Sequence, residues 1–181
     1  MSDPKPSFTR IRLFIDDDLA AGSAIALTRD QSHYLQNLMG PNEGERIAVF
    51  NGRDGEYWAD IVAANPGALV VEPAEILRPQ TAEPDLWLAF APLKRAAVEF
   101  LTAKATEIGV SRLLPVLTGR TNAETVDTRQ LRVHAVAAAE QSERLTVPEG
   151  CNPVTFAEFL RDWPVDRKLL VGDETGAGLP V

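Results

Sequence analysis

The sequence predicts an α/β protein in two parts, a small β-barrel followed by an open, mostly parallel α/β sheet. Short strands with tight turns follow one another closely up to residue 77, which is typical of a small barrel. From residue 86 onward strands alternate with helices, which favours a parallel sheet. The stretch between these parts, RPQTAEPD, holds two prolines and has no hydrophobic periodicity. We therefore expect domains at residues 1–77 and 86–181, joined by a linker at residues 78–85.

Four strands and one helix are predicted in the first domain. Residues 10–15 alternate polar and apolar side chains, which is the period of a half-buried strand. Residues 30–39 favour a helix with Thr28 or Asp30 as its N-cap. Further strands, joined by the turns NGRDG and NPG, are expected at residues 46–50, 56–64 and 68–77. The aromatic residues expected in the barrel core are Phe14, Phe50, Tyr57 and Trp58.

The second domain is predicted to alternate strands and helices. A nearly continuous apolar run at residues 86–91 indicates a strand buried on both faces. Residues 95–108 indicate a helix whose apolar stripe ends at Ile108, with Thr102 and Thr106 facing away from the stripe. The other elements expected are a strand at 112–117, a long helix at about 127–145, a short helix at 155–163 and a last strand at 168–172.

Composition and charge exclude several classes of protein. The chain has 181 residues, a net charge of −8 and one cysteine. An acidic chain argues against broad, nonspecific nucleic-acid binding, although one basic face remains compatible with it. The single cysteine and the two histidines argue against an internal disulfide and a metal site. No apolar run has the length of a membrane span, and the N-terminus lacks the apolar core of a secretion signal, so a soluble cytoplasmic protein is expected.

A cluster of polar side chains follows three alanines in the stretch AAAEQSERLTVPEG. In a helical projection Glu140 and Arg144 continue the arc of Val133 and Ala137, and their i, i+4 spacing allows them to pair. Ala139 falls on a different arc, which is predicted to face water. One interpretation is a partly buried ion pair that fixes helix packing, and the other is a polar functional site at the end of a buried helix.

Three segments resemble one known family. They are EQSERLTVPE at residues 140–149, KATEIGVSRLLPV at residues 104–116 and GRTNAE at residues 119–124, where Thr121 replaces the usual serine. Together they are similar to the ribosomal RNA small-subunit methyltransferase E family, whose members methylate uridine N3 in 16S rRNA. The resemblance implies a PUA-like β-barrel that helps to hold RNA. It also implies a SPOUT-type α/β domain with a trefoil knot, which binds S-adenosylmethionine and dimerises.

The chain departs from the family pattern at its end. It finishes with GDETGAGLPV, where the family continues with a G-P-E-G-G loop and a further segment. We therefore expect a chain that is cut within its second domain and is inactive by itself. Its cofactor-binding residues are unknown and are expected in the missing segment. No metal is expected.

The resemblance also assigns candidate site residues. The catalytic candidates are Arg144, Glu140 and Arg120, with the arginines contacting phosphate or uracil oxygens and Glu140 orienting an arginine or acting as a base. The RNA-binding candidates are Gln141, Lys94, Lys104, Arg10 and Arg12. A surface pair of Lys104 with Glu107 explains Lys104 equally well, and a solvated strand face is the stronger interpretation of Arg10 and Arg12.

The function implied by the resemblance is S-adenosylmethionine-dependent methylation of uridine N3 in 16S rRNA, by a cytoplasmic homodimer whose partner is the small ribosomal subunit. Two alternatives stay open at this point. One is an RNA-binding module without catalysis, and the other is an unrelated α/β enzyme that acts on a small metabolite, which the net charge of −8 would suit.

Overall fold

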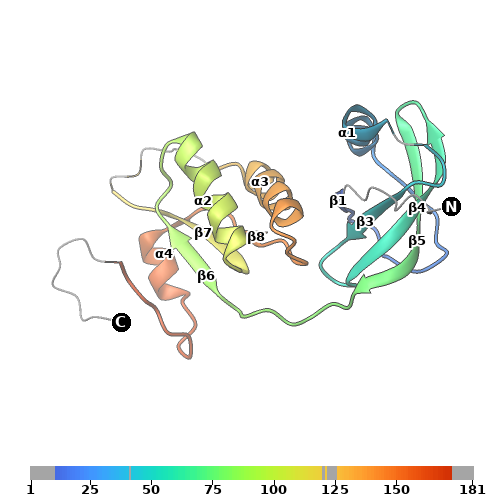
Figure 1. Ribbon diagram of the computed structural model, residues 1–181. Coiled ribbons are helices and arrows are strands. Elements are labelled where there is room, and N and C mark those ends of the chain that lie inside the picture. The colour runs from blue at the N-terminus through green and yellow to red at the C-terminus, as the bar shows by residue number, and fades with distance from the viewer. Residues whose placement is uncertain (1–10, 41, 120, 122–125, 173–181) are drawn as a thin grey trace.

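The computed structural model describes residues 11–40, 42–119, 121 and 126–172. Figure 1 shows two groups of elements that are joined by one extended segment, with α3 as the helix of the second group that faces the first. Among the described residues, no helix combines the length and the apolar character that a membrane span requires. The described residues also contain no group of His, Cys, Asp and Glu side chains that could hold a metal ion.

The first group is a curled five-stranded sheet with one helix. Its elements are β1 (Arg12–Phe14), β2 (Ile25–Ala26), α1 (Arg29–Met39), β3 (Arg46–Phe50), β4 (Glu56–Asn65) and β5 (Ala68–Arg78). The strand order is β1-β3-β4-β5-β2, in which β1 runs parallel to β3 and the other pairs are antiparallel. The helix begins at a capping box between Thr28 and Gln31 and ends at Gly40, whose φ of 57° suits glycine.

Aliphatic side chains fill the core of this sheet. Leu35, Ile47 and Val71 are among its fully buried members. Of the aromatic residues expected there, Tyr57 packs against this core, whereas Phe14 and Phe50 form a separate cluster against the second group of elements. The predicted place of Phe14 and Phe50 in the barrel core is therefore wrong, because the sheet turns these two rings outward onto α3.

The second group is a parallel sheet with three helices. Its elements are β6 (Trp87–Phe90), α2 (Arg95–Glu107), β7 (Arg112–Leu117), α3 (Thr128–Gln141), β8 (Glu149–Gly150), β9 (Val154–Thr155) and α4 (Phe156–Arg161). Strand β7 is central and pairs in parallel with β6 on one edge and with β8 and β9 on the other. Helices α2 and α3 pack on each other. The predicted parallel α/β sheet is confirmed.

Two burial predictions for β6 and α2 are wrong. Three of the four residues of β6 are only half-buried, so the strand is not covered on both faces. In α2, Thr102 and Thr106 are fully buried while Ile108 is 73% exposed. The Thr106 hydroxyl donates to the Thr102 carbonyl at 2.8 Å, and this bond lets a polar side chain lie in the helix interface.

The long helix ends earlier than predicted. α3 stops at Gln141, Ser142 is its C-cap, and Glu143 adopts a φ of 59°, in the left-handed region. Arg144 therefore leaves the helix and the predicted arc. Val133 is 59% exposed while Ala139 is fully buried, which is the reverse of the predicted orientation.

The strand predicted at residues 168–172 is absent, since the structure describes these residues and none is in a strand. Leu170 and Val171 are 77% and 75% exposed. The second edge of β7 is instead occupied by β8 and β9, two-residue strands that are too short to show a period in the sequence.

Candidate functional site at the end of helix α3

The signature stretch lies at the junction between the two groups of elements. Residues 139–144 form the last turn of α3 and the loop that follows it. The final carbonyl groups of a helix have no partner within the helix and carry partial negative charge. Two arginines of the first sheet, Arg12 of β1 and Arg78 of β5, bind the carbonyls of this turn.

Arg12 uses its whole guanidinium on protein acceptors. Its Nε donates to Glu56 Oε1 at 2.5 Å, and its Nη1 donates to the carbonyls of Ala139 and Glu140 at 2.6 and 3.0 Å. Its Nη2 donates to the Arg144 carbonyl at 3.0 Å. The side chain is 5% exposed, so the predicted solvated strand face is wrong for this residue. Each of the three guanidinium nitrogens thus has an acceptor within the protein, which argues against the predicted contact with an RNA phosphate.

Glu56 connects the two arginines. It is fully buried, and its second oxygen accepts from Arg78 Nε at 2.6 Å. Arg78 in turn donates through Nη2 to the Glu143 carbonyl at 2.8 Å. Burial alone would raise the pKa of Glu56, but the hydrogen bonds from Arg78 and Arg12 outweigh burial, and the pKa lies below its ordinary value.

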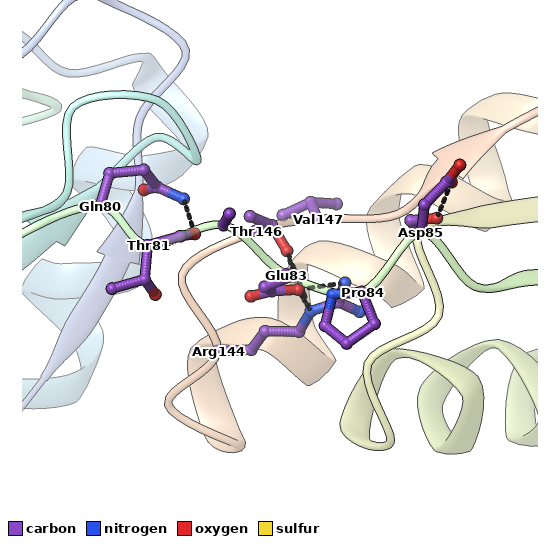
Figure 2. A pocket seen from close by; sticks show the side chains of 10 residues that line it. Gln80, Thr81, Glu83, Pro84, Asp85, Arg144, Thr146 and Val147 are labelled. Carbon is purple, nitrogen blue, oxygen red and sulfur yellow. Dashed lines mark hydrogen bonds and ion pairs between the residues drawn. The ribbon is translucent and has the colours of Figure 1, made fainter.

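Arg144 is held inside the second group of elements and at the linker (Figure 2). Its Nε donates to Glu83 Oε2 at 2.8 Å, and Nη1 donates to the carbonyls of Thr106 and Val110 at 3.0 and 2.7 Å. Thr146 donates to the same Glu83 oxygen at 2.5 Å. Burial pushes the pKa of Glu83 upward, but the bonds from Arg144 and Thr146 bring it below the ordinary value. This geometry favours the structural interpretation of Arg144.

Glu140 and Arg144 do not form the direct pair that their spacing allowed, since no ion pair joins them within the described part of the chain. The reason is the end of the helix at Gln141, which removes the i, i+4 geometry. A Glu140 carboxylate oxygen instead accepts from the Phe14 backbone N–H at 2.9 Å. Burial raises the pKa of Glu140, and this effect exceeds the opposing effects of the Phe14 N–H and the charge of Arg12.

A cavity lies on each side of this junction. One, of about 450 Å³, is lined by the linker together with Ser111, Arg144 and Thr146. The other, of about 670 Å³, lies between α1, β1 and α3 and includes Tyr34, Glu140 and Gln141 in its lining. Gln141 is exposed at this groove, as its predicted RNA-binding role requires.

The other candidate residues are dispersed. Lys94 is exposed at the N-terminal end of α2, and its side chain makes no hydrogen bond or ion pair with any described residue. Lys104 pairs with Glu107 at 2.7 Å on the surface, as the alternative interpretation expected. Arg10 and Arg120 lie outside the described residues. The structure therefore gathers Arg12, Glu140 and Arg144 at the junction and leaves the two lysines apart.

A third cavity, of about 380 Å³, lies between the N-terminal halves of α2 and α3. Glu99 and His134 line it, with His134 Nε2 at 3.6 Å from Glu99 Oε1. The cavity follows the carboxyl end of β6, which is the side of a parallel sheet where ligands usually bind.

Sequence reasoning missed Glu56, Arg78 and Glu83. Glu56 lies 44 residues from Arg12, and Glu83 lies 61 residues from Arg144. Residues this far apart in the sequence cannot be recognised as partners from helical or strand spacing. The only signal was that Glu56 opens a strand whose neighbours are mostly apolar, where a charge needs a partner.

Comparison with known proteins places the chain in a family. A family model described as an RNA methyltransferase domain matches residues 80–179, and one described as an RNA methyltransferase PUA domain matches residues 27–74. Ribosomal RNA small subunit methyltransferase E of Rickettsia conorii is 30% identical over 151 residues, covering 83% of this chain and 62% of that protein. The protein of the same name from Synechocystis is 30% identical over 156 residues, covering 82% and 50%. The chain thus spans between half and two thirds of the length of these curated relatives.

Solved structures show the same fold. A candidate methyltransferase from Legionella pneumophila with bound S-adenosylmethionine matches with a TM-score of 0.76 and 24% identity, over 88% of this chain and 69% of that one. Ribosomal RNA small subunit methyltransferase E from Neisseria gonorrhoeae, bound to S-adenosyl methionine, matches with a TM-score of 0.76 and 20% identity, over 86% and 66%. The predicted fold, a PUA-like domain followed by a SPOUT-type α/β domain, is confirmed. The chain belongs to the RNA methyltransferase family whose members include ribosomal RNA small subunit methyltransferase E.

Proposed function

We propose that this protein transfers a methyl group from S-adenosylmethionine to N3 of a uridine in 16S ribosomal RNA. The observation that carries the proposal is the RNA methyltransferase model over residues 80–179, preceded in the same chain by an RNA methyltransferase PUA domain. The names of the two curated relatives support ribosomal RNA as the substrate. The titles of two structural neighbours support S-adenosylmethionine as the methyl donor.

The described cavities do not fit the cofactor well enough to assign its contacts. In the cavity beside α2, Glu99 pairs with Arg95 and Asp127 pairs with Arg129. In the linker cavity, Glu83 pairs with Arg144. These charges already have partners among the described residues, which argues against a direct role for them in the reaction. When bound, S-adenosylmethionine supplies an electrophilic methyl group.

The residues of this chain would act on the RNA. Uridine N3 carries a proton that must leave before or during methyl transfer. The base must also be accessible, which requires that it is unstacked and has no pairing partner. Lys94 is exposed and unpaired among the described residues near the carboxyl end of β6, and we assign it to a phosphate contact. Gln141 is assigned to an RNA contact at the groove, and Arg120 to the uracil anion by family resemblance alone. Arg144 and Glu140 are assigned to holding the junction, with Glu140 the remaining candidate base.

The test is methyl transfer to small-subunit RNA and to intact small subunits, with methyl-labelled S-adenosylmethionine. Because the chain spans 62% and 50% of its curated relatives, the complete gene product is assayed beside the 181-residue chain. After nucleolytic digestion, mass spectrometry should find labelled N3-methyluridine. RNA binding by the complete product without any labelled nucleoside would overturn the proposal and favour a non-catalytic RNA-binding module.

A further inference from the structure

The last turn of α3 and the loop after it present four carbonyl oxygens to the first domain. They belong to Ala139, Glu140, Glu143 and Arg144. Two arginines bind all four, and a single buried carboxylate, Glu56, holds both arginines. These groups come from β1, β4 and β5 on one side and from the end of α3 on the other.

An apolar contact lies beside this polar one. Phe14 and Phe50 meet edge to face, with ring centroids 5.5 Å apart, and pack against Ala139 and Leu145. The Arg12 guanidinium lies over the Phe50 ring at 4.3 Å from its centroid. The Phe50 ring therefore fixes the guanidinium on one face of its plane, and the hydrogen bonds fix it along its donor edges.

We propose that Arg12, Glu56 and Arg78 form a latch that fixes the orientation of the first domain relative to α3, and that the signature turn is the docking element of this latch. The latch residues act by positioning, since the charged groups of all three are engaged with other groups of the protein. This inference rests on the proposed function for its biological use, because a fixed orientation would let RNA held by the first domain present one base to the second.

The geometry requires arginine at position 12. A guanidinium offers five N–H donors in one plane, and Arg12 makes four hydrogen bonds with them, one to Glu56 and three to backbone carbonyls. A lysine keeps the charge but has three donors on one atom, which cannot reach acceptors on both sides of the junction. Arg12→Lys therefore separates a latch from a simple charge effect.

The experiment measures the distance between the domains. Spin labels are attached to cysteines at exposed Val62 in β4 and exposed Ile108 at the end of α2, with Cys151 changed to serine. Electron spin resonance should give one narrow distance distribution for the otherwise unaltered chain. The distance distribution should become at least about twofold broader in Arg12→Lys. The same broadening is expected in the double variant Arg12→Met with Glu56→Gln, which removes both charges of the buried pair together.

Two further variants make the result decisive. Arg46→Lys is the matched control, because Arg46 pairs with Asp60 at 2.5 Å with the same type of contact but on the surface; its distribution should stay narrow. Arg78→Met keeps the buried pair of Arg12 and Glu56, so it should fold even if the other variants do not, and it should also broaden the distribution. Narrow distributions in Arg78→Met and in every folded Arg12 variant would overturn the latch.

A kinetic readout follows on the complete gene product. Arg12→Lys should lower kcat/KM for small-subunit RNA by about 10- to 100-fold, as misplacement of a substrate does, while Arg46→Lys leaves it unchanged. Full activity of Arg12→Lys would contradict the positioning role. The distance measurement needs neither RNA nor cofactor, so a failure of the proposed function leaves the test of the latch intact.

Discussion

At the scale of single residues, the arginine of the signature stretch is buried among acceptors that all belong to the protein. Sequence reasoning left open whether Arg144 serves catalysis or packing. Its contacts with Glu83, Thr106 and Val110 account for most of its donors, and its side chain is 7% exposed. A catalytic contact would need a donor that is not already bound to the protein, so the geometry favours packing.

Arg144→Ala should therefore lower the free energy of unfolding by about 3–5 kcal/mol, because it leaves the Glu83 carboxylate and two carbonyls without their donor. Denaturant unfolding measures the change. Lys104→Ala, which breaks the exposed pair with Glu107, is the control and should change stability by less than about 0.5 kcal/mol. A loss below about 1 kcal/mol for Arg144→Ala would return the residue to the catalytic candidates.

Glu56 should make the junction sensitive to acid. Its folded-state pKa lies below the ordinary value, so the unfolded chain binds the proton more tightly. The stability that Glu56 contributes is then complete above the unfolded pKa, about 4.3, and is lost as the pH falls through the folded pKa. Urea unfolding between pH 7 and pH 3 should show this loss, and Glu56→Gln should flatten it. An equally steep loss in Glu56→Gln would show that other carboxylates account for it.

Glu140 should change the stability with pH in the opposite direction to Glu56. Burial raises its pKa in the folded state, so its ionisation costs stability, and this cost grows as the pH rises through the folded pKa. Glu140→Gln keeps an oxygen that can accept the Phe14 N–H and should be more stable than the unaltered chain at pH 7.5 but not at pH 4. Calorimetric unfolding at both pH values tests this. Lower stability of Glu140→Gln at pH 7.5 would mean that the carboxylate charge itself holds the junction.

At the scale of elements, the hydrophobic period predicted that a helix or strand is present more reliably than it predicted where that element ends. Strand β3 has the predicted bounds, and the helices were expected at nearly the right places. The end of α3 was missed because Glu140 to Arg144 contain no glycine or proline to mark it. The burial of Thr102 and Thr106 was missed because the helical pattern counts threonine as a polar residue. The Thr106 hydroxyl can nevertheless be buried, since it donates to the Thr102 carbonyl within the same helix.

The left-handed residue at the end of α3 offers a direct test of this turn. Glu143 has a φ of 59°, which is unfavourable for most side chains and worst for β-branched ones. Glu143→Asn and Glu143→Val both remove the carboxylate, but asparagine tolerates this conformation. The valine variant should be less stable than the asparagine variant by about 1–2 kcal/mol in denaturant unfolding. Equal stability would mean that the turn can adopt another conformation at no cost.

At the scale of the whole molecule, the sequence predicted two domains and their order but not how they meet. Their contact depends on pairs far apart in the chain, such as Arg12 with Glu56 and Phe14 with Ala139, and neither composition nor period encodes these pairs. For the same reason the sequence placed the candidate residues on this turn, while the groups that they bind were found only in the structure.

The placement of Phe14 gives a test of the domain division. In the 181-residue chain Phe14 packs with Phe50 against Ala139 and Leu145, so Phe14→Ala should cost about 3–5 kcal/mol of stability. A piece of the chain that ends at Arg78 lacks α3, so the Phe14 ring no longer packs against that helix. The aliphatic core around Ile47 remains complete in this piece.

We therefore expect residues 1–78 to fold by themselves, with a dispersed amide spectrum, and to lose less than about 1 kcal/mol on Phe14→Ala. The measurement is denaturant unfolding of four proteins, the chain and the piece, each with and without the substitution. Ile47→Ala is the control, because its side chain is fully buried in the first domain and should cost about 2–5 kcal/mol in both contexts. Equal costs of Phe14→Ala in the chain and in the piece would show that the ring belongs to the core of the first domain and that the interface owes its stability to the arginines alone.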